Sequence, residues 1–138
     1  MFYDFSMTDP ALPPSGYNPR DYSPIAVTVD TVVFTVEDAD FRVLLIERGV
    51  PPFKGRWALP GGFLKPDEDL TTAAMRELAE ETGTGKLGVF LEQLGTYDHP
   101  DRDPRMRVVT VAYWAIVPAL PNPRGGTDAA DAKLVPVS

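Results

Sequence analysis

The sequence predicts a single α/β or α+β domain built on a mixed β-sheet. The chain has 138 residues, a length that suits one domain. Its hydrophobic fraction is 43%, and a chain of this size buries roughly two-thirds of its extended surface, so a real core is expected. One helix-like segment lies among several segments rich in β-branched residues, and this order is typical of a sheet covered by a helix.

Two regions differ in composition. Residues 1–24 are rich in proline and aromatic side chains and show no period of 2 or 3.6. We expect an irregular extension there, which either docks on the body or on a second subunit, or forms a loose tail. Residues 25–138 carry the periodic segments and are predicted to form the domain.

The first strands are predicted from β-branched runs. Residues 25–36 and 41–48 flank the acidic turn 37–40, and this pattern is typical of a hairpin. A short strand is expected at residues 57–59. It leads into Gly61 and Gly62, which predict a glycine turn.

The helix is expected to begin near residues 67–70, with Asp67 or Asp69 as the N-cap. Gly83 is the predicted residue beyond its carboxyl end. The sector predicted to pack on the sheet contains Met75, Leu78, Ala79 and Thr82.

Three further strands are predicted after the helix, at residues 89–97, 107–117 and 133–137, with a polar turn over 121–132. The chain stops directly after the last predicted strand. We therefore expect that one face of the sheet is left uncovered.

Charge and composition exclude several classes of protein. The formal net charge of −7 argues against a nucleic-acid or anionic-membrane partner, because both require a basic surface. The chain has no cysteine and one histidine, His99, so disulfides, thiolate catalysis and Cys-rich or His-rich metal sites are excluded. The sequence contains neither an apolar run of membrane-spanning length nor a signal-like amino terminus, which predicts a cytoplasmic protein.

Three carboxylates cluster at the end of the predicted helix. Glu77, Glu80 and Glu81 are spaced i, i+3 and i+4, so they share about a third of the helix circumference. Each like-charge pair costs about 0.2–0.5 kcal/mol in an isolated helix. A solvated acidic face is the structural alternative, but hard divalent cations such as Mg²⁺ and Mn²⁺ prefer carboxylate oxygens. The cluster therefore predicts a metal site.

The same segment resembles the signature of the Nudix hydrolase family. That signature is a glycine, five residues, a glutamate, seven residues, and then Arg-Glu-apolar-x-Glu-Glu-x-Gly-apolar. The matching residues here are Gly62, Glu68, Arg76, Glu77, Leu78, Glu80, Glu81 and Gly83. Thr84 departs from the aliphatic residue that the family prefers, which affects a packing position and not the chemistry. The resemblance extends from about residue 25 to residue 137.

The resemblance implies the α/β fold class, as a Nudix-type α/β/α sandwich with a mixed β-sheet. It also implies hydrolysis of a nucleoside diphosphate linked to another moiety, with Mg²⁺ or Mn²⁺ as cofactor. The family's second helix, carboxyl-terminal to the last strand, is missing from the sequence, which suggests a truncated or minimal version. Family members are often homodimers in which the neighbouring chain completes the substrate pocket, so we expect a homodimer.

The family's site residues are carried over by position. Glu80 and Glu81 would hold the metal, and Glu77 would be a further ligand or would orient water. The backbone carbonyl of Gly62 or Gly61 and the carboxylate of Glu68 are further expected ligands. Arg76, spaced i, i+4 from Glu80, is expected to orient the glutamates through an ion pair.

Other residues are candidate substrate contacts. Pro100 lies 16 positions beyond Thr84, a spacing that resembles the ADP-ribose pyrophosphatase branch and implies cleavage of ADP-ribose to AMP and ribose 5-phosphate. Arg48, Arg105 and Arg107 are candidates for phosphate binding, or are surface arginines. Trp57 stacks on a base or belongs to the core. Candidates for a loop-borne general base, or turn residues, are Asp98, Asp101, Asp103, Asp128 and Asp131. His99 is an exposed loop histidine or a substrate contact.

Two other functions stay open. The overall run from residue 28 to residue 63 resembles the Nudix part of transcription regulators that bind ADP-ribose, so the chain is alternatively a truncated ligand sensor. A third hypothesis is house-cleaning hydrolysis of oxidised nucleoside triphosphates. All three predict metal binding, and the intact glutamates favour catalysis.

Overall fold

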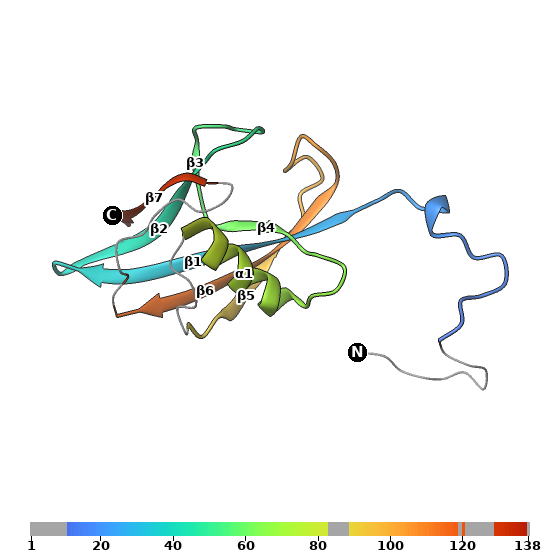
Figure 1. Cartoon of the computed structure of the whole chain (residues 1–138), viewed down its shortest axis with the longest axis horizontal. Helices are drawn as coiled ribbons and strands as arrows, with labels where there is room; N and C mark the ends of the chain where they lie inside the picture. Colours follow the sequence, from blue (N-terminus) through green and yellow to red (C-terminus); the bar gives the residue numbers. More distant parts are fainter. Residues whose placement is uncertain (1–10, 83–88, 119, 121–128, 138) are drawn as a thin grey trace.

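The computed structural model describes residues 11–82, 89–118, 120 and 129–137. These residues form a sheet crossed by one α-helix, as Figure 1 shows. The elements in chain order are the 3-10 helix Pro19–Asp21, β1 (Ala26–Glu37), β2 (Asp40–Arg48), β3 (Trp57–Ala58), β4 (Gly61–Phe63), α1 (Leu70–Thr82), β5 (Glu92–Tyr97), β6 (Val108–Val117) and β7 (Ala129–Pro136).

The sheet is mixed, as the sequence predicts. Its main order is β3-β2-β1-β6-β5, with β4 paired to β1 and β7 paired to β2. Strands β1 and β6 run parallel from the pair Ala26 and Val108 to the pair Thr35 and Val117. The other pairings are antiparallel. Strand β1 therefore lies at the centre of the sheet. Strands β4 and β2 pair with the same edge of β1, β4 near its amino end and β2 near its carboxyl end.

The predicted hairpin is confirmed. Strands β1 and β2 pair in antiparallel register, with Glu37 opposite Asp40. Asp38 and Ala39 form the turn, with φ of 52° and 64°. Two consecutive residues in the left-handed region match a type I′ turn, whose twist suits the right-handed twist of the strands.

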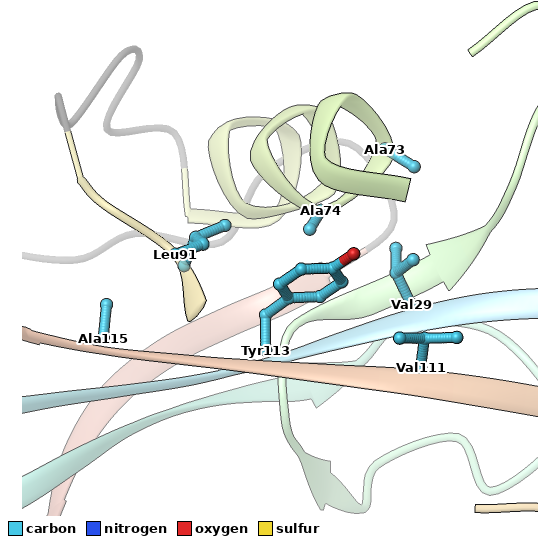
Figure 2. Close-up of a cluster of buried hydrophobic side chains, with 7 residues drawn as sticks. All are labelled: Val29, Ala73, Ala74, Leu91, Val111, Tyr113 and Ala115. Atoms are coloured by element: carbon cyan, nitrogen blue, oxygen red, sulfur yellow. The ribbon is translucent and has the colours of Figure 1, made fainter. Parts of the chain in front are cut away.

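Helix α1 covers one face of the sheet. Asp69 is its N-cap, because its side chain accepts a hydrogen bond from the backbone N–H of Thr72 at 2.8 Å. The buried face of the helix centres on Ala73, Ala74 and Leu78. Figure 2 shows Ala73 and Ala74 on the helix and Tyr113 on the sheet below it, together with the other buried side chains of this cluster.

The predicted packing sector of the helix was partly wrong. Leu78 is buried as expected, but Ala73 and Ala74 are fully buried and Met75 and Ala79 are only half-buried. The side chain of Thr82 and the whole of Gly83, the predicted residue beyond the helix end, lie outside the described residues. The buried face of the helix therefore differs from the predicted one. It includes one of the acidic residues, Glu81, whose exposed fraction is 7%.

Two other predictions need correction. Gly61 and Gly62 do not form a turn, because they belong to β4 and pair with Asp30 and Val29 of β1. The last strand begins at Ala129, within the segment predicted as a polar turn, because pairing with β2 overrides its weak local strand propensity.

The opposite face of the sheet carries apolar side chains. Val36, Phe41 and Ile116 are about half exposed there, and Phe41 stacks on Phe34 with ring centroids 4.8 Å apart. Within the described residues, α1 is the one α-helix. No helix in this part of the chain is both long and apolar enough to cross a membrane.

The segment before β1 leaves the body of the protein. Figure 1 shows the described part of this amino-terminal arm, residues 11–25, extending away from the sheet. Leu12, Tyr17, Tyr22 and Ile25 are each at least half exposed. Among the described residues of the arm, the 3-10 helix Pro19–Asp21 is the one regular element, and the division of the chain at residue 25 stays a prediction.

Candidate functional site

An open cavity of about 740 Å³ lies where β1, β2, β4 and α1 meet the loop between β5 and β6. The acidic and basic residues of its lining come mainly from different elements. Acidic side chains come mainly from the central strand and the helix, whereas several basic side chains come from β2 and the loop. The charged lining residues are Asp30, Arg48, Lys65, Arg76, Glu77, Glu80, Glu81, Arg102, Asp103 and Arg105.

Arg76 holds three glutamates together. Its guanidinium pairs with both oxygens of Glu68, with Glu77 at 2.5 Å and with Glu80 at 3.3 Å. It also donates to the carbonyl of Phe63 at 3.1 Å, which ties the helix to β4. The i, i+4 ion pair expected between Arg76 and Glu80 is therefore present, and it belongs to a larger network.

Glu68 is an anchor for this network. Its carboxylate also accepts a hydrogen bond from the backbone N–H of Lys65 at 2.9 Å, and its side chain is 8% exposed. The hydrogen bonds from Arg76 lower the pKa of Glu68 to about 2. Glu68 does not line the cavity. Here it positions Arg76, and its role as a metal ligand stays a prediction.

Glu81 is the most enclosed of the helix carboxylates. It accepts a hydrogen bond from the backbone N–H of Gly61 at 2.8 Å. Burial raises the pKa of Glu81 to about 8, and the nearby carboxylates of Glu77 and Asp30 add to the rise, whereas the Gly61 N–H and Arg48 oppose it. A buried carboxylate among other carboxylates is costly unless a cation accompanies it.

The two glycines of β4 make room for these carboxylates. A Cβ atom on Gly62 would lie 2.4 Å from the carboxyl carbon of Glu77. One on Gly61 would lie 2.3 Å from the carbonyl oxygen of Val29 and 2.4 Å from Oδ1 of Asp30. Gly61 is therefore required for the close approach of two backbones, and Gly62 leaves room for the Glu77 carboxylate, rather than either forming a turn.

Asp30 belongs to the site although the sequence reasoning missed it. It lies in the middle of β1, lines the cavity, and accepts a hydrogen bond from the hydroxyl of Thr110 through Oδ2. Burial raises its pKa, against the opposing effects of Thr110 and Arg102. A signal was present in the sequence, since Asp30 is the one charged residue between residues 25 and 36.

The basic side of the cavity contains Arg48, Arg102 and Arg105. Arg48 donates through Nε to the carbonyl of Pro52 at 2.6 Å. Arg105 pairs with Asp103 at 2.8 Å and lies over the ring of Phe63, 4.7 Å from its centroid. Sequence reasoning missed Arg102, whose side chain makes no ion pair with any residue that the structure describes.

Several predicted residues are not brought to the cavity. Trp57 and Pro100 are absent from its lining, and the ammonium of Lys133 lies 3.8 Å from the centroid of the Trp57 ring. Arg107 instead donates to the carbonyl of Asp98. Of the candidate bases, Asp103 lines the cavity, whereas Asp98, Asp101 and Asp131 do not, and Asp128 lies outside the described residues. His99, the candidate substrate contact, does not line the cavity either.

The donor set of the cavity fits a hard divalent cation. Glu77, Glu80 and Glu81 offer oxygen ligands only, as Mg²⁺ and Mn²⁺ prefer. Within the described residues, no three such side chains converge on one point, and Glu77 and Glu80 are paired with Arg76.

Comparison with known proteins agrees with this arrangement. Residues 26–138 match the family model described as the NUDIX domain. The chain belongs to the Nudix family. It is similar to the ADP-ribose pyrophosphatase of Methanocaldococcus jannaschii, with 42% identity over 94 residues that cover 68% of this chain and 52% of that protein. The predicted family and its resemblance to the ADP-ribose pyrophosphatase branch are thus confirmed.

Two further relatives bear on the function of this Nudix chain. The ADPR responsive transcriptional repressor NtrR of Acinetobacter baylyi is 41% identical over 103 residues, covering 73% of this chain and 40% of that protein. The NUDIX domain of Shewanella oneidensis NrtR, solved with ADP ribose, superposes with a TM-score of 0.79 at 36% identity, covering 88% of this chain and 79% of that one. The chain spans about half or less of the length of the two curated relatives.

Proposed function

We propose that this Nudix chain hydrolyses a nucleoside diphosphate linked to another moiety, with ADP-ribose as substrate and Mg²⁺ or Mn²⁺ as cofactor. The observation that carries the proposal is that helix carboxylates and arginines line the same cavity. Its volume of about 740 Å³ is within the range of small-molecule sites. The similarity to an ADP-ribose pyrophosphatase and to a domain solved with ADP ribose supports the choice of substrate.

The reaction adds water to one phosphorus of the diphosphate and breaks the bridging P–O bond, which gives AMP and ribose 5-phosphate. A bound divalent cation would neutralise the phosphate oxygens and make bound water more acidic. Glu80 and Glu81 would hold this cation, with Glu77 as a further ligand or as the group that orients water. The carbonyl of Gly62 or Gly61 is a further proposed ligand.

The arginines would bind the phosphates. Arg48 and Arg102 line the cavity and have guanidinium N–H groups without an ion-pair partner among the described residues. Arg105 is held by Asp103, and this ion pair lowers the pKa of Asp103. Transfer of Arg105 to a substrate phosphate would release Asp103, which would then be more basic.

A second candidate function is an ADP-ribose sensor, favoured by the similarity to NtrR and NrtR. A panel of nucleoside diphosphate compounds with Mg²⁺ or Mn²⁺, followed by released monophosphate, tests both candidates. We expect AMP from ADP-ribose. Tight binding of ADP-ribose without cleavage would favour the sensor. Inert ADP-ribose together with a cleaved oxidised nucleoside triphosphate would favour the house-cleaning hydrolase.

We also propose a homodimer in the cytoplasm, with no nucleic-acid partner. The amino-terminal arm extends from the body with Tyr17 and Tyr22 exposed, their ring centroids 6.0 Å apart, and a second chain would bury them. The net charge of −7 disfavours binding to nucleic acid.

A further inference from the structure

Asp30 occupies an unusual position for a carboxylate. It lies in the central strand between Val29 and Thr31, both fully buried, and is opposite Gly61 of β4 and Ala112 of β6. Its side chain nevertheless opens into the cavity. A valine or threonine would stabilise the strand more. Burying a carboxylate costs free energy unless hydrogen bonds within the protein replace its hydrogen bonds to water.

The two oxygens of Asp30 have different environments. Oδ2 accepts a hydrogen bond from the hydroxyl of Thr110, a buried residue of β6. Oδ1 lies beside the Cα atom of Gly61, where a Cβ atom would be only 2.4 Å away. Within the described residues, Oδ1 accepts no hydrogen bond and Asp30 forms no ion pair. One oxygen is thus held in place while the other is available to a ligand.

The place of Asp30 restricts which ligand group it can meet. Gly61 lies between Asp30 and Glu81, since its N–H donates to Glu81 and its Cα atom faces Asp30. Asp30 is therefore close to Glu81, one of the carboxylates proposed to hold the cation that would bind the diphosphate. An ionised carboxylate only accepts hydrogen bonds, so it repels phosphate oxygens and recognises N–H or O–H donors. The donors nearest to the diphosphate of a nucleotide sugar are the hydroxyls of its sugars.

We propose that Asp30, oriented by Thr110, accepts a hydrogen bond from a ribose hydroxyl next to the diphosphate and so selects substrates that carry this hydroxyl. This inference rests on the proposed function, because it assumes that a cation held by Glu80 and Glu81 would bind the diphosphate. Asp30 then positions the sugar and takes no part in breaking the P–O bond.

The test measures binding separately from cleavage. The probe is the α,β-methylene analogue of ADP-ribose, whose diphosphate bridge resists hydrolysis, titrated by calorimetry in the presence of Mg²⁺. Two matched probes lack a candidate hydroxyl: one has 2′-deoxyadenosine, and the other carries a simple alkyl group in place of the terminal ribose. They distinguish which of the two sugars contacts Asp30.

We expect wild type to bind the full probe better than one of the two matched probes. Asp30→Asn should weaken binding of the full probe about tenfold, or about 1.4 kcal/mol, and should abolish that preference. Thr110→Val should act in the same direction and Thr110→Ser should restore wild-type affinity, because serine keeps the hydroxyl. The control is Asp38→Asn, in the hairpin turn far from the cavity lining, with thermal unfolding to check that each variant folds.

The inference is overturned if Asp30→Asn keeps the same relative affinities for the three probes as wild type, or if wild type binds none of them. Failure of the proposed function gives a different result. In that case wild type binds the full probe and releases no AMP from ADP-ribose, while Asp30→Asn still loses the preference. That result would keep the inference and assign the site to sensing.

Discussion

The carboxylate of Glu81 accepts a hydrogen bond from the backbone N–H of Gly61 at 2.8 Å. This contact joins the last turn of α1 to β4, and β4 is itself paired with the central strand. The carboxylate of Glu81 is therefore held beside Gly61, the residue of β4 that pairs with Asp30. The two glycines of β4 leave space for this arrangement, because a Cβ atom on Gly61 would meet Val29 and Asp30 of β1, and one on Gly62 would meet the carboxylate of Glu77.

Gly61→Ala should destabilise the protein. Its Cβ atom would lie 2.3 Å from the backbone oxygen of Val29, which the sheet holds in place. We expect a loss of about 1–3 kcal/mol in the free energy of unfolding, the range for overpacking a buried position. Denaturant unfolding measures it. Gly95→Ala in β5 is the matched control, because its Cβ atom would meet no atom closer than 3.7 Å. Equal stability of the two variants would contradict the close approach.

Gly62→Ala should affect activity more than stability. The atoms that its Cβ would meet are the carboxylate of Glu77, which is the end of a side chain that rotates. The backbone need not move, so we expect a loss below about 1 kcal/mol in stability, as for a well-tolerated substitution. Displacing Glu77 should nevertheless reduce kcat at saturating Mg²⁺. A variant with full activity would show that the placement of Glu77 beside Gly62 is not needed.

The metal-free protein should lose stability as the pH rises from 5 to 9. Glu81 has a folded-state pKa of about 8 against 4.5 for the ordinary group, so the folded state binds more protons between these values. Its contribution to stability is complete below about 4.5 and is lost as pH rises through about 8. Glu68, with a pKa of about 2, contributes stability that is lost only as pH falls through that value, so it does not change in this window.

Unfolding by urea in the presence of EDTA measures this dependence. Glu81→Gln should flatten it, because glutamine does not titrate. Added Mg²⁺ should restore stability at the alkaline end, since metal binding requires the deprotonated carboxylate. If the free energy of unfolding of Glu81→Gln falls with pH as steeply as that of wild type, other groups cause the pH dependence.

The amino-terminal arm should support self-association. Replacing Tyr17 and Tyr22 by serine removes two exposed aromatic side chains that pack on each other and leaves the sheet untouched. We expect light scattering to give the mass of a dimer for wild type and a larger monomer fraction for the double variant. Ile116→Ser, on the exposed face of the sheet, is the control. A monomeric wild type would exclude the proposed homodimer.

Local patterns were sufficient to predict the hairpin, the helix and the acidic cluster. β-branched runs, the N-cap Asp69 and the spacing of Glu77, Glu80 and Glu81 are all signals between near neighbours in the chain. The i, i+4 pair of Arg76 with Glu80 is of the same kind, and the structure contains it.

Long-range pairing explains what the sequence did not predict. Asp30 becomes part of the site only because β4 and β6 bring Gly61 and Thr110 beside it. Gly61 resembles a turn residue until its strand partner on β1 is known. Trp57 lies beside Lys133 because β3 and β7 both pair with β2. No pattern between near neighbours in the sequence predicts this pairing.

The most direct test of the account is the rate of AMP release from ADP-ribose at saturating Mg²⁺ by wild type, Glu80→Gln and Glu81→Gln. We expect both variants to lose about 10²-fold or more in kcat, the scale for removal of one electrostatic stabiliser, and EDTA to abolish wild-type activity. Glu92→Gln, on the exposed edge strand β5, should be fully active. If both helix variants retain near-wild-type turnover, these glutamates do not hold the metal and the proposed site is wrong.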